Sequence, residues 1–194
     1  GNPINSQGGG IFRFKEPWTG ILKYYWYGAH YYEADSFRMD PSAIYDKTRF
    51  KSVVCYSSTD LVNWKKENDV FTDAVAFPDG RPTWAGRLGV AYIRELDLYA
   101  MLIQHGREVL IATSKTPTGN FSWHRKINMT DRIGTSNTGD QTVFTDEETG
   151  ISYLVYSYGR GRNKIYISEI GIKNGVIDLL DCTKIFEGES REGN

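Results

Sequence analysis

The sequence predicts an all-β protein, a β-propeller of four-stranded blades. Short runs rich in Val, Ile and Tyr, bounded by Gly, Asp, Asn and Thr, dominate the 194 residues, whereas helical periodicity is hard to find. A strand–turn–strand pattern also occurs three times along the chain. The step from Ala112 to Ile167 is about 55 residues, near the period of the longer propeller repeats. A propeller would gather its loops around one central funnel, where a ligand would bind.

The sequence also predicts the turns and strands within each repeat. The sequence DEETG predicts a hairpin turn in which Gly150 adopts a positive φ, and TPTGN predicts a second turn before FSW. Glycines 8–10 in the first repeat favour close backbone approach at the propeller axis, although such a run could also cradle an anion. The strongest strand predictions are KYYWYG (23–28), SVVCYSS (52–58), LYAMLIQ (98–104), EVLIATS (108–114), ISYLVYS (151–157) and KIYISEI (164–170).

Two segments, 35–51 and 69–83, break the pattern and are expected to be loop insertions on the ligand face. The last residues, FEGESREGN, are expected to begin a fourth blade. A ring of three blades would leave sheet edges open. We therefore expect residues 1–194 to be the N-terminal part of one propeller domain, with blades 1–3 and the start of blade 4. The remainder of the propeller would then lie C-terminal to this chain.

Charge and cysteine content exclude several classes of partner. The net charge is −1 and the charged residues are interspersed, so no nucleic acid is expected. No apolar run approaches membrane-spanning length, so no membrane partner is expected either. Cys55 and Cys182 are expected to be buried free thiols, with a disulfide between them as the alternative, and two cysteines give no metal-site spacing. The 13 Tyr and 5 Trp could fill strand faces or stack on sugars.

Five motifs carry a family resemblance. PINSQGGGIFRF with YYWYG, CYSSTDLVNW, GRLGVAYI with LYAMLIQ, GDQTVFTDEETGISYLVYS and the terminal REGN follow one another along nearly the whole chain. In this order they resemble the galactanase-like branch of glycoside hydrolase family 43, in clan F. The resemblance implies a five-bladed propeller of which this divergent, apparently truncated chain holds about three blades.

The resemblance also implies hydrolysis of a glycosidic bond with inversion, which needs a protonated carboxyl and a base on opposite faces of the sugar. Glu192 stands where the family places its general acid. Asp140 stands where the family places an Asp that orients the acid and holds up its pKa by like-charge proximity. Most of the family carries the base as an Asp at the start of blade one, where this chain has residues 7–10, Gln-Gly-Gly-Gly. The galactanase branch is thought to use a glutamine beyond blade four instead, so no base is assigned here.

Three departures from the family pattern would alter which sugar hydroxyls are recognised: Gln7 replaces a His, and Ala29 and Gly86 each replace a Glu. Trp26 could bind sugar or simply pack within its strand. His105 could bind sugar or be an ordinary core or surface histidine. Trp84 lies in a loop from which it could reach the funnel. The candidate substrate-binding residues are Gln7, Gly9, Trp26, Trp84, Arg87, His105 and Gln141.

The expected function is that of an exo-acting or side-chain-trimming glycosidase on a galactose-, arabinose- or xylose-containing polysaccharide. A propeller that binds carbohydrate without cleaving it is the first alternative, and a protein-interaction propeller is the second. No cofactor and no metal ligand are assigned, although the family often holds a central calcium ion. Because polysaccharides are met outside the cytoplasm, a periplasmic or extracellular location is expected.

Overall fold

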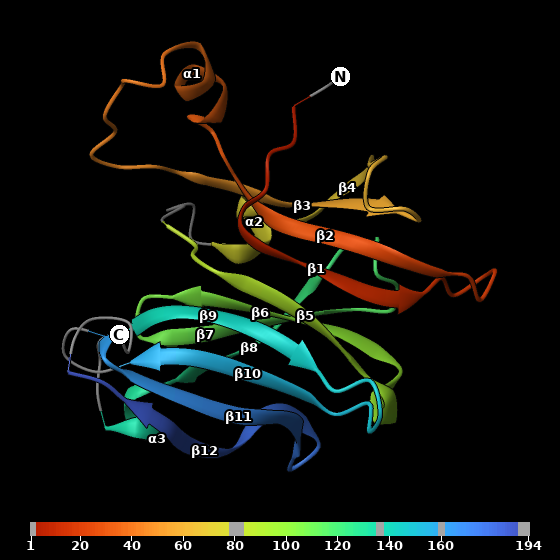
Figure 1. Cartoon of the computed structure of the whole chain (residues 1–194), viewed down its shortest axis with the longest axis vertical. Coiled ribbons are helices and arrows are strands. Elements are labelled where there is room, and N and C mark those ends of the chain that lie inside the picture. Colours follow the sequence, from red (N-terminus) through yellow and green to blue (C-terminus); the bar gives the residue numbers. More distant parts are fainter. Residues whose placement is uncertain (1–2, 78–83, 135–137, 159–161, 190–194) are drawn as a thin grey trace.

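The computed structural model describes residues 3–77, 84–134, 138–158 and 162–189, which form three four-stranded antiparallel sheets (Figure 1). In each sheet the strands neighbour one another in chain order, so each is a simple meander. The first sheet contains β1 (Gln7–Lys15), β2 (Leu22–Tyr31), β3 (Phe50–Ser58) and β4 (Lys65–Thr72). The second contains β5 (Leu88–Ile93), β6 (Leu98–His105), β7 (Glu108–Ser114) and β8 (Ser122–Asn128). The third contains β9 (Thr138–Thr145), β10 (Ser152–Tyr158), β11 (Lys164–Lys173) and β12 (Val176–Glu187).

These sheets confirm the prediction of an all-β chain with four-stranded blades. All six of the strongest strand predictions coincide with strands of the structure. The predicted hairpin between β9 and β10 is also present, with Gly150 at φ 74°. Residue 150 needs this left-handed conformation because the backbone reverses direction there, and glycine adopts it without steric cost.

The two expected loop insertions are only partly irregular. Helix α1 (Ala34–Met39) occupies the start of the first, and residues 69–72 of the second belong to β4. Strand β4 extends this far because Phe71 pairs with Val53 on β3 and is almost fully buried. The other helices are single turns: α2 (Asp73–Ala76), α3 (Thr130–Ile133) and the 3₁₀ turn η1 (Arg94–Leu96).

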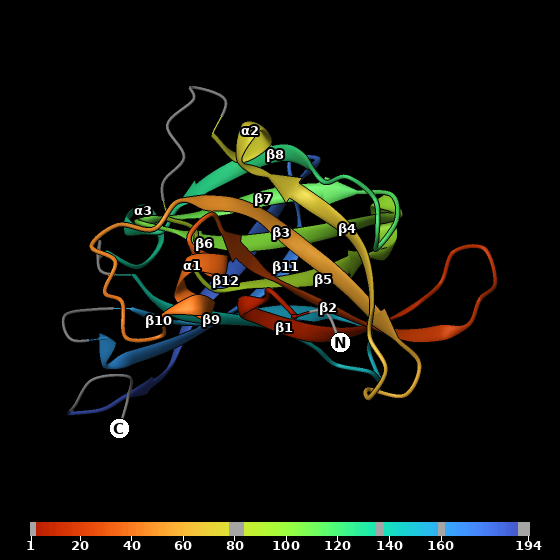
Figure 2. The ribbon, with the colours of Figure 1, turned by 90° about the horizontal axis from the view of Figure 1, so that it is seen from above.

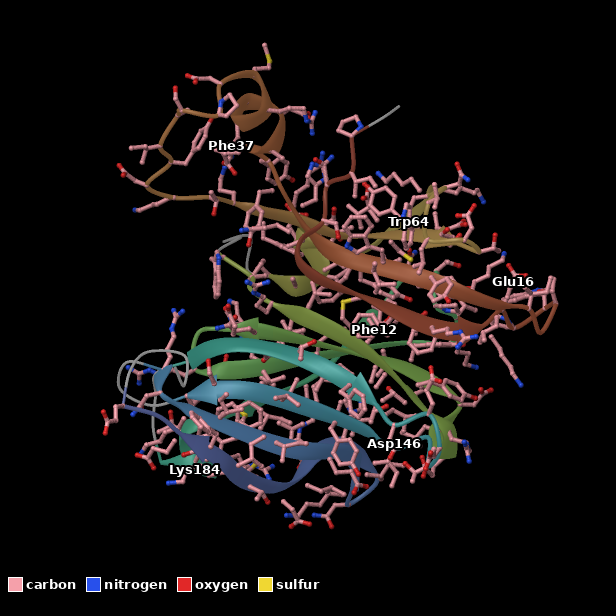
Figure 3. The ribbon with its side chains drawn as sticks, in the orientation of Figure 1. Phe12, Glu16, Phe37, Trp64, Asp146 and Lys184 are labelled. Atoms are coloured by element: carbon pink, nitrogen blue, oxygen red, sulfur yellow. The ribbon has the colours of Figure 1, made fainter. Side chains whose placement is uncertain are left out.

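Two apolar cores join the sheets. The first packs the aromatic face of β2, including Tyr25 and Tyr27, against β5–β7 of the second sheet. The second core packs the opposite face of that sheet against Leu154, Tyr156 and other residues of the third sheet. Phe12 on β1 packs against both cores and lies between the sheets in Figure 3. Because each sheet uses alternate side chains for each face, the second sheet is covered on both sides.

The innermost strands β1, β5 and β9 run in the same direction and lie next to one another (Figures 1 and 2). Their first residues meet at one end of the molecule, the side on which α1 and α2 also lie in Figure 1. We call this the strand-start end and define it by Gly8, Arg87 and Asp140. The hairpins that follow β1 and β9 lie at the opposite end, where Figure 3 labels Glu16 and Asp146. The fold therefore brings three separate chain segments together at the strand-start end.

Both cysteines are free, as expected, although only Cys55 is fully buried and Cys182 is partly exposed. Burial raises the pKa of the Cys55 thiol to about 12. Cys55 therefore serves as a small apolar core residue. Among the described residues, none of the helices has the length and apolarity needed to cross a bilayer.

Candidate functional site

An ion pair marks the centre of the strand-start end. Arg87, just before β5, lies with its Nη2 atom 3.2 Å from Oδ2 of Asp140 on β9. Both side chains are about half exposed, at 50% and 52%. Such an exposed pair adds little to stability, so a ligand can compete for both groups at small energetic cost. The guanidinium offers donors and the carboxylate offers acceptors, the combination that binds sugar hydroxyls.

The glycine run of β1 forms one wall beside this pair. Gly8 has φ 61°, and a Cβ built on it would lie 3.6 Å from Cδ of Arg87. Gly9 lies so close to β2 that a Cβ would fall 2.6 Å from the carbonyl carbon of Tyr27. Only glycine fits there, because any side chain would collide with backbone. The run therefore lets the β1 backbone lie close to β2 and to Arg87, while its predicted approach to a propeller axis stays a prediction.

Gln104, at the end of β6, joins the strands that carry the ion pair. Its side-chain amide donates to the Gly139 carbonyl, directly before Asp140, and its Oε1 accepts from the Arg87 N–H at 3.3 Å. Its own backbone N–H donates to the Arg87 carbonyl at 2.9 Å. Only 3% of Gln104 is exposed, so these bonds are shielded from water. Gln104 thus positions Arg87 and Asp140 relative to each other.

Trp84 and Gly86 complete the described part of the site. A Cβ built on Gly86 would lie 2.7 Å from Cζ2 of Trp84 and 2.6 Å from Oε1 of Gln104. The indole therefore occupies the space over Gly86, while 43% of Trp84 remains exposed. The hydroxyl of Tyr31 on β2 donates to the Ala85 carbonyl and fixes this segment to the first sheet.

The structure brings five of the predicted site residues to the strand-start end, namely Gln7, Gly9, Trp84, Arg87 and Asp140. Gln7 is exposed at the first position of β1. The predicted general acid, Glu192, lies outside the described residues. The catalytic and binding roles of these six residues stay predictions.

Three other predicted residues have different surroundings. Trp26 lies on the face of the first sheet that points away from the second sheet, with its ring 5.3 Å from that of Trp64. The Gln141 amide is buried and donates to the Leu102 carbonyl of β6 at 3.2 Å. His105 ends β6 with its ring 5.3 Å from that of Phe77, and burial lowers its pKa. These contacts pack sheets and strands.

Sequence reasoning missed Gln104 and Tyr31. The sequence signal for Gln104 is a single amide at the end of the apolar run LYAMLI, because a polar residue continuing a buried strand needs a buried partner. Tyr31 carries no such signal, since tyrosines are common throughout β2. Its role depends on a contact 54 residues away in the sequence.

A central calcium ion is not supported by the described residues. Within residues 3–77, 84–134, 138–158 and 162–189, no three His, Cys, Asp or Glu side chains are grouped as metal ligands. Because calcium needs six to eight oxygen ligands, the single carboxylate of Asp140 beside a cationic Arg87 does not fit it.

Comparisons with known proteins agree with this architecture. The sequence profile of glycosyl hydrolases family 43 matches residues 23–192. An exo-β-1,3-galactanase from Clostridium thermocellum superposes with a TM-score of 0.69 at 23% identity, covering 97% of this chain and 39% of its own. An exo-β-1,3-galactanase from Phanerochaete chrysosporium, solved with galactose, superposes with a TM-score of 0.66 at 23% identity. The superposition covers 95% of this chain and 40% of the galactanase. An endo-1,4-β-xylanase from Bacteroides thetaiotaomicron superposes with a TM-score of 0.53 at 22% identity. The superposition covers 90% of this chain and 53% of the xylanase.

At these identities the likeness shows a shared fold. The chain spans about two fifths of the length of the two galactanases. No curated protein sequence matches it.

Proposed function

Because this chain belongs to glycosyl hydrolase family 43, we propose that it forms part of a glycosidase that trims galactose-, arabinose- or xylose-containing polysaccharides from chain ends or side branches. The observation that supports this proposal is the exposed Arg87–Asp140 pair at the strand-start end. It places a carboxylate on an innermost strand, where the loops of a propeller surround the funnel. Such a substrate is met outside the cytoplasm, so the proposal includes a periplasmic or extracellular location.

In the proposed reaction, Glu192 donates its proton to the glycosidic oxygen as the bond from that oxygen to the anomeric carbon breaks. A base takes a proton from water while the water oxygen bonds to the anomeric carbon from the opposite face, which inverts the configuration. Asp140 would orient Glu192, and Arg87 would hold Asp140 in place through the ion pair. The base is assigned to no residue of this chain.

Among the candidate sugars, galactose has the most support. The two galactanases superpose better than the xylanase, with TM-scores of 0.69 and 0.66 against 0.53. The fungal galactanase has also been solved with β-1,3-galactotriose. Xylose and arabinose remain alternatives that a substrate panel separates.

A propeller that binds carbohydrate without cleaving it is the second candidate. The observation that favours it is the glycine run after Gln7, where most of the family has its catalytic Asp. In the structure this run serves close backbone packing, with Gly9 against β2. A glycan array that shows binding, together with no product release, would support this alternative.

The test uses the full-length protein and a panel of β-1,3-galactobiose, an aryl arabinofuranoside and an aryl xyloside. We expect Glu192→Gln and Asp140→Asn each to lower kcat by about 100-fold or more on the sugar that is cleaved, because each removes a group from acid catalysis. Glu148→Gln is the matched control, since this exposed carboxylate lies in the β9–β10 turn at the opposite end. Unchanged turnover in Glu192→Gln would contradict the assignment.

A further inference from the structure

We propose that Trp84 is the aromatic platform of the sugar site and that Gly86 sets its orientation, so that the pair selects a galactopyranosyl unit. This inference rests on the proposed function, because it identifies how the same site would recognise its substrate. It depends on steric, anchoring and exposure observations that are independent of the catalytic assignment.

The first observation is steric. The six-membered ring of Trp84 lies over Gly86, and a Cβ on residue 86 would fall 2.7 Å from Cζ2 of the indole. The same Cβ would meet Oε1 of Gln104 at 2.6 Å, and this atom belongs to a buried, hydrogen-bonded amide. Because the Gln104 amide is buried and held by hydrogen bonds whereas the indole is partly exposed, a side chain at residue 86 would displace the indole.

The second observation is that the backbone beside Trp84 is held from two sheets. The Tyr31 hydroxyl donates to the Ala85 carbonyl from the first sheet. The Gly86 N–H donates to the Gln104 carbonyl at 2.8 Å, and the Arg87 N–H donates to its side chain at 3.3 Å. A ring next to an anchored backbone loses less conformational entropy when a ligand stacks on it.

The third observation is that the indole is available. Trp84 is 43% exposed, and among the described residues no aromatic ring stacks on it. By contrast, Trp26 and Trp64 have their rings 5.3 Å apart on the first sheet. Arg87 follows shortly after Trp84 along the chain and pairs with Asp140 of β9, so this half-exposed pair supplies polar partners. A half-exposed indole beside fixed polar groups suits a ligand with one apolar face and several hydroxyls.

Galactopyranose presents such a face. Its axial 4-hydroxyl leaves the C–H groups of carbons 3, 4 and 5 on the same side of the ring, so one face is apolar and the other is polar. A xylopyranose has equatorial hydroxyls and two similar faces, and an arabinofuranose has a smaller ring. A single indole next to a charged pair can therefore discriminate best in favour of the galacto configuration.

The experiment compares Trp84→Ala, Trp84→Phe and Gly86→Ala in the full-length protein. We expect Trp84→Ala and Gly86→Ala to raise the KM for β-1,3-galactobiose about tenfold, the loss expected for one aromatic stacking contact. Trp84→Phe should recover most of the affinity because it keeps an aromatic face. Trp123→Ala is the matched control, since Trp123 is also 43% exposed but lies on β8, with Lys126 over its ring. Circular dichroism melts verify that each variant folds.

A second readout does not require hydrolysis. Titration with galactose should change the tryptophan fluorescence of the wild type and of Trp123→Phe, and this change should be lost in Trp84→Phe. Wild-type cleavage with unaltered KM in Trp84→Ala and Gly86→Ala would overturn the platform and leave the proposed function standing. Galactose binding without cleavage of any substrate would overturn the hydrolase and leave the platform standing. If Trp84→Ala and Gly86→Ala raise the KM more for the xyloside or the arabinofuranoside than for galactobiose, the choice of galactose is overturned.

Discussion

At the scale of single residues, buried and half-buried polar side chains join neighbouring sheets through hydrogen bonds to backbone groups. Gln104 and Gln141 each donate from the side-chain amide to a carbonyl of the adjacent sheet. His124 on β8 accepts a hydrogen bond at Nε2 from the Ile177 N–H of β12, at 3.2 Å. Such bonds matter because an unpaired buried N–H or carbonyl costs about 1–3 kcal/mol. The contacts between neighbouring sheets therefore include specific hydrogen bonds as well as apolar packing.

The bond to His124 predicts acid sensitivity. Burial, followed by the nearby Arg125 charge, lowers the pKa of His124, and only the neutral ring can accept from Ile177. The unfolded chain therefore binds more protons than the folded chain below the ordinary histidine pKa of about 6.5. His124 contributes its full stability above this pH, and the contribution falls as the pH drops toward the lowered folded value. Urea unfolding at several pH values between about 7.5 and about 5.5 should show the decrease.

Burial also lowers the pKa of His30 and His105, so part of the decrease comes from them. His124→Gln keeps an acceptor but cannot titrate, and it should show a smaller decrease than the wild type. An identical pH slope in both proteins would contradict the role of His124.

At the scale of secondary-structure elements, one carboxylate joins a helix to two strands from different sheets. Asp178 on β12 is 5% exposed and accepts from Nη2 of Arg132 on α3 at 2.8 and 2.9 Å. It also accepts from Nη1 of Arg125 on β8 at 3.4 Å. The outer strands of a propeller lie furthest apart, so a charged contact there adds a restraint that the two central cores do not supply.

We predict that Asp178→Asn lowers the free energy of unfolding by about 3 kcal/mol, because removing one member of a buried ion pair leaves the partner charge uncompensated. Urea denaturation followed by tryptophan fluorescence measures this change. Lys184→Ala is the control: Lys184 pairs with Glu187 in the exposed part of β12, so no measurable change is expected. Equal effects in the two variants would show that Asp178 has no special role.

At the scale of the whole molecule, the face of the third sheet opposite the second core carries a group of half-buried and exposed apolar side chains. Tyr153 pairs directly with Phe144, and Val155 pairs with Ile167, so these side chains share the face opposite the second core. Phe144 is 56% exposed. The solved galactanases are more than twice as long as this chain. We therefore infer that a further sheet of the full-length protein covers this face.

Phe144→Ser in the full-length protein tests this inference. If the ring is buried by another sheet, its loss should lower the free energy of unfolding by about 3 kcal/mol. Met39→Ser, at an 88% exposed position on α1, should change it by no more than about 0.5 kcal/mol. A Phe144→Ser effect as small as that of the control would mean that the face is exposed to solvent.

The strands and their grouping followed from local chemistry. Runs such as ISYLVYS alternate between core and opposite face, and the DEETG turn needs Gly150 at a positive φ, so neighbouring residues alone specify both. Prediction was weaker at the ends of elements. The helix α1 and the last residues of β4 were expected to be loops, because their stability depends on distant partners such as Val53 for Phe71.

The residue order of this chain was sufficient to establish an all-β repeat, because turn chemistry and strand alternation act over a few residues. Arg87, Asp140 and Trp84 became candidate site residues through the resemblance of the surrounding motifs to glycoside hydrolase family 43. The residue order could not show that Arg87 and Asp140 pair, that Gln104 holds them, or that Trp84 lies over Gly86. Nor could it separate Trp84 from Trp26, which belongs to an aromatic group on the first sheet. These relations join residues from different blades, so they depend on how the sheets pack against one another in three dimensions.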